Sequence, residues 1–517
     1  MMQPRHVFLS QPVSKFLLSV MLCALGFASY AANSDVDWQT LQPNNTNVSL
    51  IVADPSGKRL IDHNSQQLQL PASTLKLFTA VAATKVLGPD FVFSTGLYYQ
   101  GQREGTKLNG NLLLKFDGDP RLTSEQLGRL MAEVPKAGIT EVSGDVILLA
   151  DDDSPKWGAG WLWDDLGVCF AAPVGKLILD RNCVKGSVTS IQPKGKEATQ
   201  VSAQIYPSRV HLSYPLTIDN SASYQPTAPS ALCKLHLGHA QGNRYQLTGC
   251  YQMKDPLPLQ VAIVDPAAYI QAQIKQQIGN TFQLAGDIKV APASIEHATL
   301  ISQFPSMPLQ LLLTEMLAKS DNLIADAVLK RMGQQLFQHN GFEYGAQALK
   351  QTLSGLGVDM TDANIIDGSG LSRYNQVNAE QLFSVLLLLQ RDDELKWLIK
   401  ALPLSGYNGT LKFKRGFVNP QLRGKIRAKT GSMTGVDNLA GYIQIGEDDT
   451  AKLYPFVLLE TGLPANQYHP ATLAPPLLKQ LIKQFTKPSA IAAAATSKAK
   501  NQPKLAPPSS AANQSQQ

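Results

Sequence analysis

Hydrophobic residues follow two patterns along the chain, one typical of strands and one typical of helices. The changes from one pattern to the other divide the chain into segments. Residues 49–53 and 58–63 are rich in β-forming residues and flank Asp54-Pro55-Ser56-Gly57, a turn sequence, so they predict a hairpin. The apolar run from 75 to 87 contains neither Gly nor Pro and predicts a buried helix, with Pro71 as its start signal.

Past Gly88-Pro89-Asp90, short strand patterns alternate with turns, interrupted by one helical stretch at about 124–133. The strand patterns lie at 91–99, 111–116 and 145–149. From about 172 to 258, Ser, Thr, Pro and Gly are frequent and long periodic apolar runs are rare. This composition indicates a small β-rich module.

The hydrophobic periodicity of helices returns near Asp265-Pro266 and continues to about residue 485. It predicts helices at 308–332, 342–356, 378–389 and 475–485, and strands at 440–445 and 453–460. Lys479 and Lys483 on the last helix could favour a membrane surface, but packing on a sheet is the expected use. The outline is therefore a discontinuous α/β domain interrupted by a β-rich insert.

The two ends of the chain carry its excess charge. Arg5 and Lys15 border an apolar core at 16–27, and Ser29-Tyr30-Ala31 is a small-x-small site, so we expect an export signal cleaved after Ala31. The apolar core is too short to span a bilayer. From residue 487 the chain is basic, rich in Ala, Ser, Pro and Gln, and expected to be disordered. The net charge of +6 thus leaves a neutral middle, which argues against a nucleic-acid partner.

Four cysteines remain after the expected cleavage: Cys169, Cys183, Cys233 and Cys250. An even number in an exported chain suggests two disulfides, for which three connectivities exist. We favour Cys169–Cys183 and Cys233–Cys250 because each pair closes a short local loop. A metal site is weakly supported, because there is no C-x-x-C and no histidine at ligand spacing.

Ser73 and Lys76 form an S-x-x-K pair at the start of the first helix. Residues three apart share a helix face, so the lysine amine can reach the serine hydroxyl. A serine needs a base to become a nucleophile, and burial can lower the pKa of a lysine enough for that role. Ser497 and Lys500 have the same spacing in the tail, so the pair alone is weak evidence.

Two further motifs follow in order, Ser320-Asp321-Asn322 and Lys429-Thr430-Gly431-Ser432. Taken singly, each would be an ordinary turn or strand end. Together with Ser73 and Lys76 they are the signature of penicillin-binding proteins and class A β-lactamases.

The three motifs contain the groups that acyl transfer needs. Ser320 can relay a proton to the leaving amine, and Asn322 can hydrogen-bond the substrate amide. Lys429 and Thr430 can hold a terminal carboxylate. Gly431 has no side chain, so a substrate backbone can approach this edge strand closely.

The mature chain closely resembles the class C low-molecular-mass penicillin-binding proteins, the D-alanyl-D-alanine carboxypeptidase/endopeptidases of the penicillin-binding protein 4 type. The resemblance rests on the three motifs and on Asp367-Gly368-Ser369-Gly370-Leu371-Ser372-Arg373. In the insert it rests on Gly160-Trp161-Leu162-Trp163-Asp164-Asp165-Leu166 and Asp180-Arg181-Asn182-Cys183. It implies an α/β (α+β) fold, in which a serine β-lactamase/transpeptidase-like domain is interrupted by a nested, β-rich, two-domain insert.

We place the boundaries of this architecture by combining the resemblance with the hydrophobic pattern. They are 1–31 for the signal peptide, 32–90 and 291–486 for domain I, 91–171 and 259–290 for domain II, 172–258 for domain III, and 487–517 for the tail.

The resemblance also implies a reaction. The backbone N–H groups of Ser73 and Ser432 would form the oxyanion hole, and the enzyme would hydrolyse D-Ala-D-Ala ends and D-alanyl–diaminopimelate cross-links of peptidoglycan in the periplasm. Penicillins would acylate Ser73, and no metal or organic cofactor would be needed. Asp165, Phe170 and Arg373 would read the diaminopimelate zwitterion. Membrane contact would be peripheral at most, and a homo-oligomer remains open.

Two rival interpretations remain. A β-lactamase shares the acylation chemistry, but the chain has neither a Glu-x-x-Leu-Asn loop nor a Tyr-x-Asn motif. A non-catalytic cell-wall scaffold would suit the long insert, but it has no reason to keep all the serines and lysines.

Overall fold

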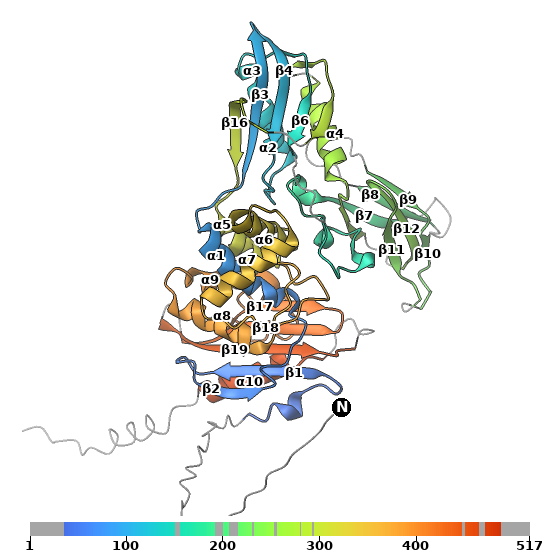
Figure 1. The fold of residues 1–517 in the computed structure, drawn as a ribbon. Helices are drawn as coiled ribbons and strands as arrows, with labels where there is room; N and C mark the ends of the chain where they lie inside the picture. The colour runs from blue at the N-terminus through green and yellow to red at the C-terminus, as the bar shows by residue number, and fades with distance from the viewer. Residues whose placement is uncertain are drawn as a thin grey trace, which may run out of the picture.

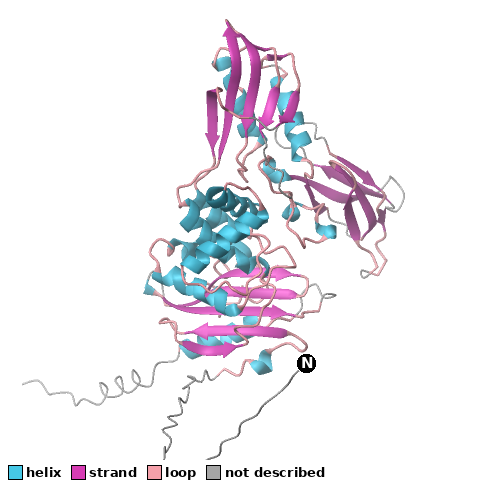
Figure 2. Ribbon diagram, viewed as in Figure 1, coloured by secondary structure: helices cyan, strands magenta, loops and turns pink. Residues whose placement is uncertain are grey.

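The computed structural model describes residues 36–149, 156–191, 200–205, 216–229, 232–252, 256–279, 281–291, 294–446, 450–464 and 471–486. The expected signal peptide and tail lie outside these ranges. The described chain forms three β-sheets, and a layer of helices lies between the first sheet and the rest (Figures 1 and 2).

The first sheet has five strands in the order β17-β18-β19-β1-β2. Their bounds are Ile426–Met433, Val436–Ile445, Lys452–Thr461, Asn47–Ala53 and Arg59–His63. β1 and β2 pair antiparallel, so the predicted hairpin is confirmed. β1 also pairs with β19, with Asn47 opposite Thr461, so the first strand of the chain lies inside the sheet.

Helices cover both faces of this sheet. One face carries α1 (Lys76–Leu87), α5 (Leu309–Lys319), α6 (Asn322–Phe337), α7 (Phe342–Gly355), α8 (Ala379–Arg391) and α9 (Trp397–Ala401). The predicted buried helix is confirmed as α1, which packs against α5, α6, α7 and α8. α10 (Ala474–Phe485) covers the other face with buried Leu477, Leu478 and Leu481, as its apolar stripe predicts. No helix in the described ranges is long and apolar enough to cross a bilayer.

The chain breaks at Ser320, where the hydrophobic pattern predicts one continuous helix over 308–332. That prediction is wrong, because α5 ends at Lys319 and α6 begins at Asn322. Ser320 adopts a left-handed conformation with φ of 59°, and the Asp321 side chain accepts a hydrogen bond from Ile324 N. Aspartate favours this helix-capping position over a helix interior, so a polar cap interrupts an unbroken apolar pattern.

The second sheet has seven strands: β3 (Ser94–Glu104), β4 (Lys107–Lys115), β5 (Glu141–Val142), β6 (Val146–Leu149), β14 (Gln283–Leu284), β15 (Ile288–Ala291) and β16 (Thr299–Pro305). Its helices are α2 (Ser124–Met131), α3 (Glu133–Lys136) and α4 (Pro266–Ile278). Because β16 pairs with β3, this sheet continues beyond residue 290, where the sequence analysis ends domain II.

The third sheet also has seven strands: β7 (Cys183–Ile191), β8 (Gln200–Ile205), β9 (Thr217–Asn220), β10 (Ser223–Tyr224), β11 (Leu235–His239), β12 (Arg244–Tyr251) and β13 (Leu257–Ala262). It corresponds to the predicted β-rich module. Cys169–Cys183 and Cys233–Cys250 are both disulfide-bonded, as nearest-neighbour pairing predicts. Figure 1 shows this sheet as a separate lobe to one side of the helical layer.

Candidate active site

Ser73 and Lys76 meet at the start of the central helix. Ser73 lies in a single 3₁₀ turn, Ala72–Leu75, and Lys76 is the first residue of α1. Lys76 Nζ donates to Ser73 Oγ at 2.9 Å, to Asn322 Oδ1 at 2.8 Å and to the Ser369 carbonyl at 2.5 Å. The S-x-x-K pair is therefore in direct contact, and Asn322 of the second motif shares the same amine.

Burial makes Lys76 a weaker base than an exposed lysine. Removal from water lowers its pKa from 10.5 to about 8, whereas the nearby carboxylates of Asp326, Asp367 and Asp321 act in the opposite direction. A lysine with this pKa is partly neutral near pH 7 and can accept a proton from the hydroxyl that it contacts.

The third motif lies on edge strand β17. Lys429 is fully buried, and its Nζ donates to Ser320 Oγ at 2.9 Å and to the Thr430 carbonyl at 2.8 Å. Burial, with the positive charges of Lys76 and Lys414, lowers the pKa of Lys429 well below its usual value. The structure thus brings all three motifs together.

The free edge of β17 presents the backbone of Thr430 and Ser432 to this cluster. At the start of the strand, Ala428 N donates to Pro403 O and Ile426 O accepts from Ser405 N, both along the outer edge. Backbone groups of alternate residues point the same way in a strand. The N–H groups of Thr430 and Ser432 therefore face outward, on the side of Ser73.

Gly431 has a different neighbour from the one that the sequence suggests. A Cβ on this residue would lie 2.7 Å from the Pro71 carbonyl and 3.0 Å from Thr74 N. The missing side chain therefore lets the Ser73 turn pack against β17, whereas the sequence analysis reserves that space for substrate.

A pocket of about 340 Å³ opens over these groups. It is lined by Ser73, Ser320, Thr410, Lys414, Thr430 and Ser432. Thr430 Oγ1 donates to Thr410 Oγ1 at 2.8 Å, and Lys414 Nζ pairs with Asp437 Oδ1 at 2.7 Å. Thr410 and Lys414 are not predicted from the sequence, because the segment that carries them matches none of the three motifs.

Two buried aspartates support the cluster from behind. Asp326 lies one turn after Asn322 on α6, and its Oδ1 accepts from the N–H groups of Gly368 and Ser369. Asp367 accepts from Ser372 N at 2.7 Å and from Trp161 Nε1 at 2.8 Å. They fix the turn whose Ser369 carbonyl binds Lys76.

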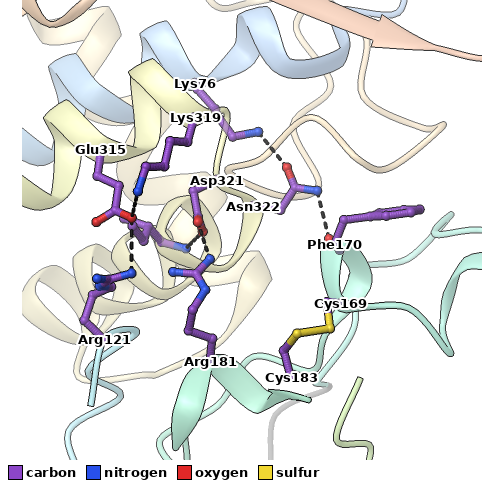
Figure 3. A network of polar contacts seen from close by, with 11 residues as sticks. Lys76, Arg121, Cys169, Phe170, Arg181, Cys183, Glu315, Lys319, Asp321 and Asn322 are labelled. Carbon is purple, nitrogen blue, oxygen red and sulfur yellow. Dashed lines mark hydrogen bonds and ion pairs between the residues drawn. A yellow bond between two sulfur atoms is a disulfide. The ribbon is translucent and has the colours of Figure 1, made fainter. Parts of the chain in front are cut away.

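The insert contacts the second motif directly (Figure 3). Asn322 Nδ2 donates to the Phe170 carbonyl at 2.8 Å, and Arg181 forms an ion pair with Asp321. The Cys169–Cys183 disulfide lies beside both contacts in sequence and in space. A third contact, Arg121 Nη1 to Glu315 Oε1 at 3.1 Å, connects the loop before α2 to α5.

Asp165 and Arg373 lie near each other at the end of β17, and Phe170 lies beside Asn322; these three residues are called the rim of the site below. Arg373 Nη1 donates to the Thr434 carbonyl, just past the end of β17, at 3.1 Å. The pKa of Asp165 is raised by partial burial and by Asp164, and Arg373 is near enough to oppose that shift. Phe170 is 51% exposed. An anionic and a cationic group therefore border the end of the motif strand, and an aromatic group lies beside the second motif.

Within the described ranges, no group of three or more His, Cys, Asp or Glu side chains could hold a metal ion.

Comparison with known sequences gives a consistent result. The model of the D-Ala-D-Ala carboxypeptidase 3 (S13) family matches residues 32–474. D-alanyl-D-alanine carboxypeptidase DacB of Haemophilus influenzae is 32% identical over 457 residues, which cover 87% of this chain and 92% of that protein. The D-alanyl-D-alanine carboxypeptidase of Actinomadura sp. is 28% identical over 425 residues, covering 78% of this chain and 76% of the relative.

Solved structures support the same family assignment as the sequence comparisons. The crystal structure of penicillin binding protein 4 from H. influenzae matches with a TM-score of 0.77 at 31% identity, covering 87% of this chain and 99% of that one. The structure of the same H. influenzae protein complexed with a β-lactam gives a TM-score of 0.73 at 29% identity and the same coverage. The chain therefore belongs to the D-Ala-D-Ala carboxypeptidase 3 (S13) family, as a serine carboxypeptidase of the penicillin-binding protein 4 type.

Proposed function

We propose that this enzyme cleaves peptidoglycan stem peptides and their cross-links in the periplasm through an acyl-enzyme on Ser73. The observation that carries the proposal is the 2.9 Å contact between Lys76 Nζ and Ser73 Oγ, beside a pocket that is lined by Ser73 and by Ser320, the partner of Lys429. A nucleophile, its base and a proton relay are thus within hydrogen-bond reach of one another.

Acylation follows from these contacts. Neutral Lys76 takes the proton of Ser73 Oγ, which attacks the carbonyl carbon of the penultimate D-alanine. The N–H groups of Ser73 and Ser432 stabilise the oxyanion that forms. Ser320 Oγ passes its proton to the leaving nitrogen and is reprotonated by the Lys76 ammonium, so the proton lost by Ser73 ends on the departing terminal D-alanine. Water then attacks the ester and restores Ser73, with the same groups moving the protons in reverse.

The remaining motif residues orient the substrate. Thr430, Thr410 and Lys414 line the pocket and would hold the terminal carboxylate, with the charge of Lys429 behind Ser320. Asn322 Nδ2 has a second hydrogen besides the one donated to Phe170, and it is available to the substrate amide. In a cross-link the leaving amine belongs to diaminopimelate, and the same cleft would provide endopeptidase activity.

The Asp165, Phe170 and Arg373 rim suits the diaminopimelate of the acylating stem. Its ammonium would pair with Asp165 and its carboxylate with Arg373, while Phe170 would wall the aliphatic part. The ordinary alternative is that these are surface charges with no ligand.

The nucleophile is tested by labelling with a fluorescent penicillin. Ser73→Ala should abolish both labelling and D-alanine release, because loss of a catalytic-triad member typically costs on the order of 10⁴ in rate. Ser497→Ala, which alters the other S-x-x-K pair of the chain, should leave both unchanged. An acyl adduct on another residue would refute the assignment, and rapid turnover of nitrocefin would instead indicate a β-lactamase.

The rim is tested by comparing two substrates. Arg373→Ala or Asp165→Ala should slow cleavage of diaminopimelate-containing peptides by roughly tenfold or more, the effect of one lost charge-assisted hydrogen bond. Acylation by a penicillin that lacks this side chain should remain within about twofold of the unaltered enzyme. Equal losses for both reactions would mean that the residues support the catalytic centre, and the specificity role would be rejected.

A further inference from the structure

A second, larger pocket adjoins the catalytic one. It measures about 840 Å³ and shares Lys414 and Ser432 with the smaller pocket. Its walls are the turn between β17 and β18, the loop before Phe417 and the approach to α10. The lining residues that matter here are Phe413, Lys414, Arg415, Met433, Thr434 and Pro475.

The position of this pocket follows from the direction of β17. If the terminal carboxylate of a substrate lies near Thr430 and Thr410, the upstream peptide must leave past Ser432 toward Met433. There the strand ends in a turn, where the Thr434 carbonyl accepts from Arg373 on one side. The second pocket includes Met433 and Thr434 from the same turn. A stem whose third residue lies at Arg373 therefore has its second residue within reach of this pocket.

The charged and apolar side chains that line the second pocket indicate what kind of group would bind there. Lys414 is paired with Asp437, which also accepts from Ser432 Oγ at 2.8 Å. Arg415 is exposed, and among the described residues it forms no ion pair. Phe413 is 80% exposed beside it. The pocket thus combines one uncompensated guanidinium with an aromatic wall, which suits a carboxylate on an otherwise uncharged peptide.

We propose that this pocket is an additional substrate subsite, in which Arg415 binds a free carboxylate of the stem peptide upstream of diaminopimelate. The inference rests on the proposed function. In a peptidoglycan stem the matching group is the free carboxylate of the glutamate that precedes diaminopimelate. Lys414 connects the two pockets, so one bound peptide can occupy both.

Steady-state cleavage of three peptides by the full chain tests this. The peptides are a short acylated D-Ala-D-Ala substrate, the complete pentapeptide stem, and the same stem with its glutamate carboxylate amidated. Arg415→Glu should raise KM for the complete stem by about tenfold, the effect of one lost charge-assisted contact, and leave kcat nearly unchanged. It should change KM for the short and amidated substrates by less than about twofold.

The matched control is Lys483→Glu, the same charge change in a separate pocket on α10 that shares no residue with the catalytic one. It should leave all three KM values unchanged. A cross-linked dimer distinguishes the other source of carboxylates: if Arg415→Glu affects only the dimer, the site holds the released stem and the upstream assignment is overturned. No change in KM for the complete stem, or equal changes for all substrates, would also overturn it. Failure of the unaltered enzyme to cleave the short substrate would refute the proposed function itself.

Discussion

Lys76 shows how burial changes the protonation of a single residue, the base of the proposed mechanism. Its pKa of about 8 means that the neutral form is a minority near pH 7 and the majority above pH 8. An exposed lysine would be almost wholly charged over the same range. Burial at the start of α1 therefore provides a neutral amine near physiological pH, which the sequence can only suggest.

Penicillin acylation should accordingly rise with pH and level off above about 8. Below that value the neutral fraction, and with it the acylation rate, should fall by about tenfold per pH unit. Stopped-flow acylation with a fluorescent penicillin measures this rising limb of the pH–rate profile. A rate that is flat between about pH 6 and 8 would show that Lys76 is not the base.

Asp326 should help to set the pH at which the acylation rate rises. Its carboxylate, when charged, raises the pKa of Lys76, whereas burial and then Asp367 raise the pKa of Asp326 itself. Its Oδ2 atom has no hydrogen-bond partner in the described part of the chain. In Asp326→Asn the side-chain oxygen can still accept from Gly368 and Ser369, but the charge is gone. The acylation limb should therefore move to lower pH, while the KM of the short substrate stays constant. If the limb does not move, Asp326 already carries a proton in the unaltered enzyme, and its charge has no part in tuning Lys76.

At the same scale, the sequence predicts motif residues and misses their supports. Ser73, Ser320 and Lys429 are recognisable because acyl transfer needs these residue types and their three motifs occur in the order that marks the family. Thr410, Lys414 and Asp326 reach the site only through tertiary packing, and their local sequences match no motif. No local pattern of polar residues distinguishes such positions from ordinary surface threonines and lysines.

At the scale of elements, the turn at 367–370 packs directly against the turn that carries Ser73, the proposed nucleophile. Gly370 has a φ of +80°, and a Cβ there would lie 1.9 Å from the Ala72 carbonyl. The neighbouring Gly368 carbonyl accepts from Thr79 Oγ1 of α1 at 2.7 Å. Backbone close to Ser73 is thus positioned by a segment far along the chain.

Gly370→Ala should therefore reduce acylation by far more than its effect on stability explains, because it displaces Ala72 and Ser73. Gly357→Ala is the matched control: Gly357 has a similar φ of +86°, but its Cβ would meet nothing within 4 Å. Backbone strain should cost each variant roughly 1 kcal/mol of unfolding free energy, and the clash with Ala72 should add to the loss in Gly370→Ala. Penicillin labelling and denaturant unfolding separate the two effects. Equal labelling of the two variants would contradict the positional role.

Element prediction succeeded where one signal dominates. The β1–β2 hairpin and the buried α1 follow from an unambiguous turn sequence and an apolar run. The prediction of one continuous helix failed at Ser320. The apolar periodicity is the same on both sides of Ser320 and Asp321, so it does not reveal that the helix ends there and that Asp321 caps a new one. Strand pairing between β16 and β3 was also missed, because local sequence carries no information about a partner so far away.

At the scale of the whole molecule, the insert acts on the catalytic cleft through its closest loop. The Cys169–Cys183 disulfide brackets Phe170 and Arg181, which contact Asn322 and Asp321. The Cys233–Cys250 disulfide joins the approach to β11 with β12 in the third sheet. Only the first disulfide is therefore placed to influence catalysis.

Replacing Cys169 and Cys183 together by Ala should slow acylation by roughly tenfold or more, because Asn322 loses its fixed partner. Replacing Cys233 and Cys250 together should leave acylation unchanged. Each pair should cost roughly 2–4 kcal/mol of unfolding free energy where the insert unfolds independently. Equal acylation rates in the two double variants would show that the insert does not hold the cleft in shape.

The position of β1 between β2 and β19 has a consequence for the order in which the molecule is made. Synthesis proceeds from the N-terminus, so Ser73 emerges long before Thr461, the partner of Asn47, exists. Until β17 to β19 arrive, the nucleophile has neither the Ser432 N–H nor the Lys429–Ser320 pair beside it. A nascent chain would therefore stay chemically silent through most of its synthesis and acquire activity only as its last strands close the sheet. Contacts between such distant segments are slow to form, so the appearance of penicillin binding should report the final step of folding.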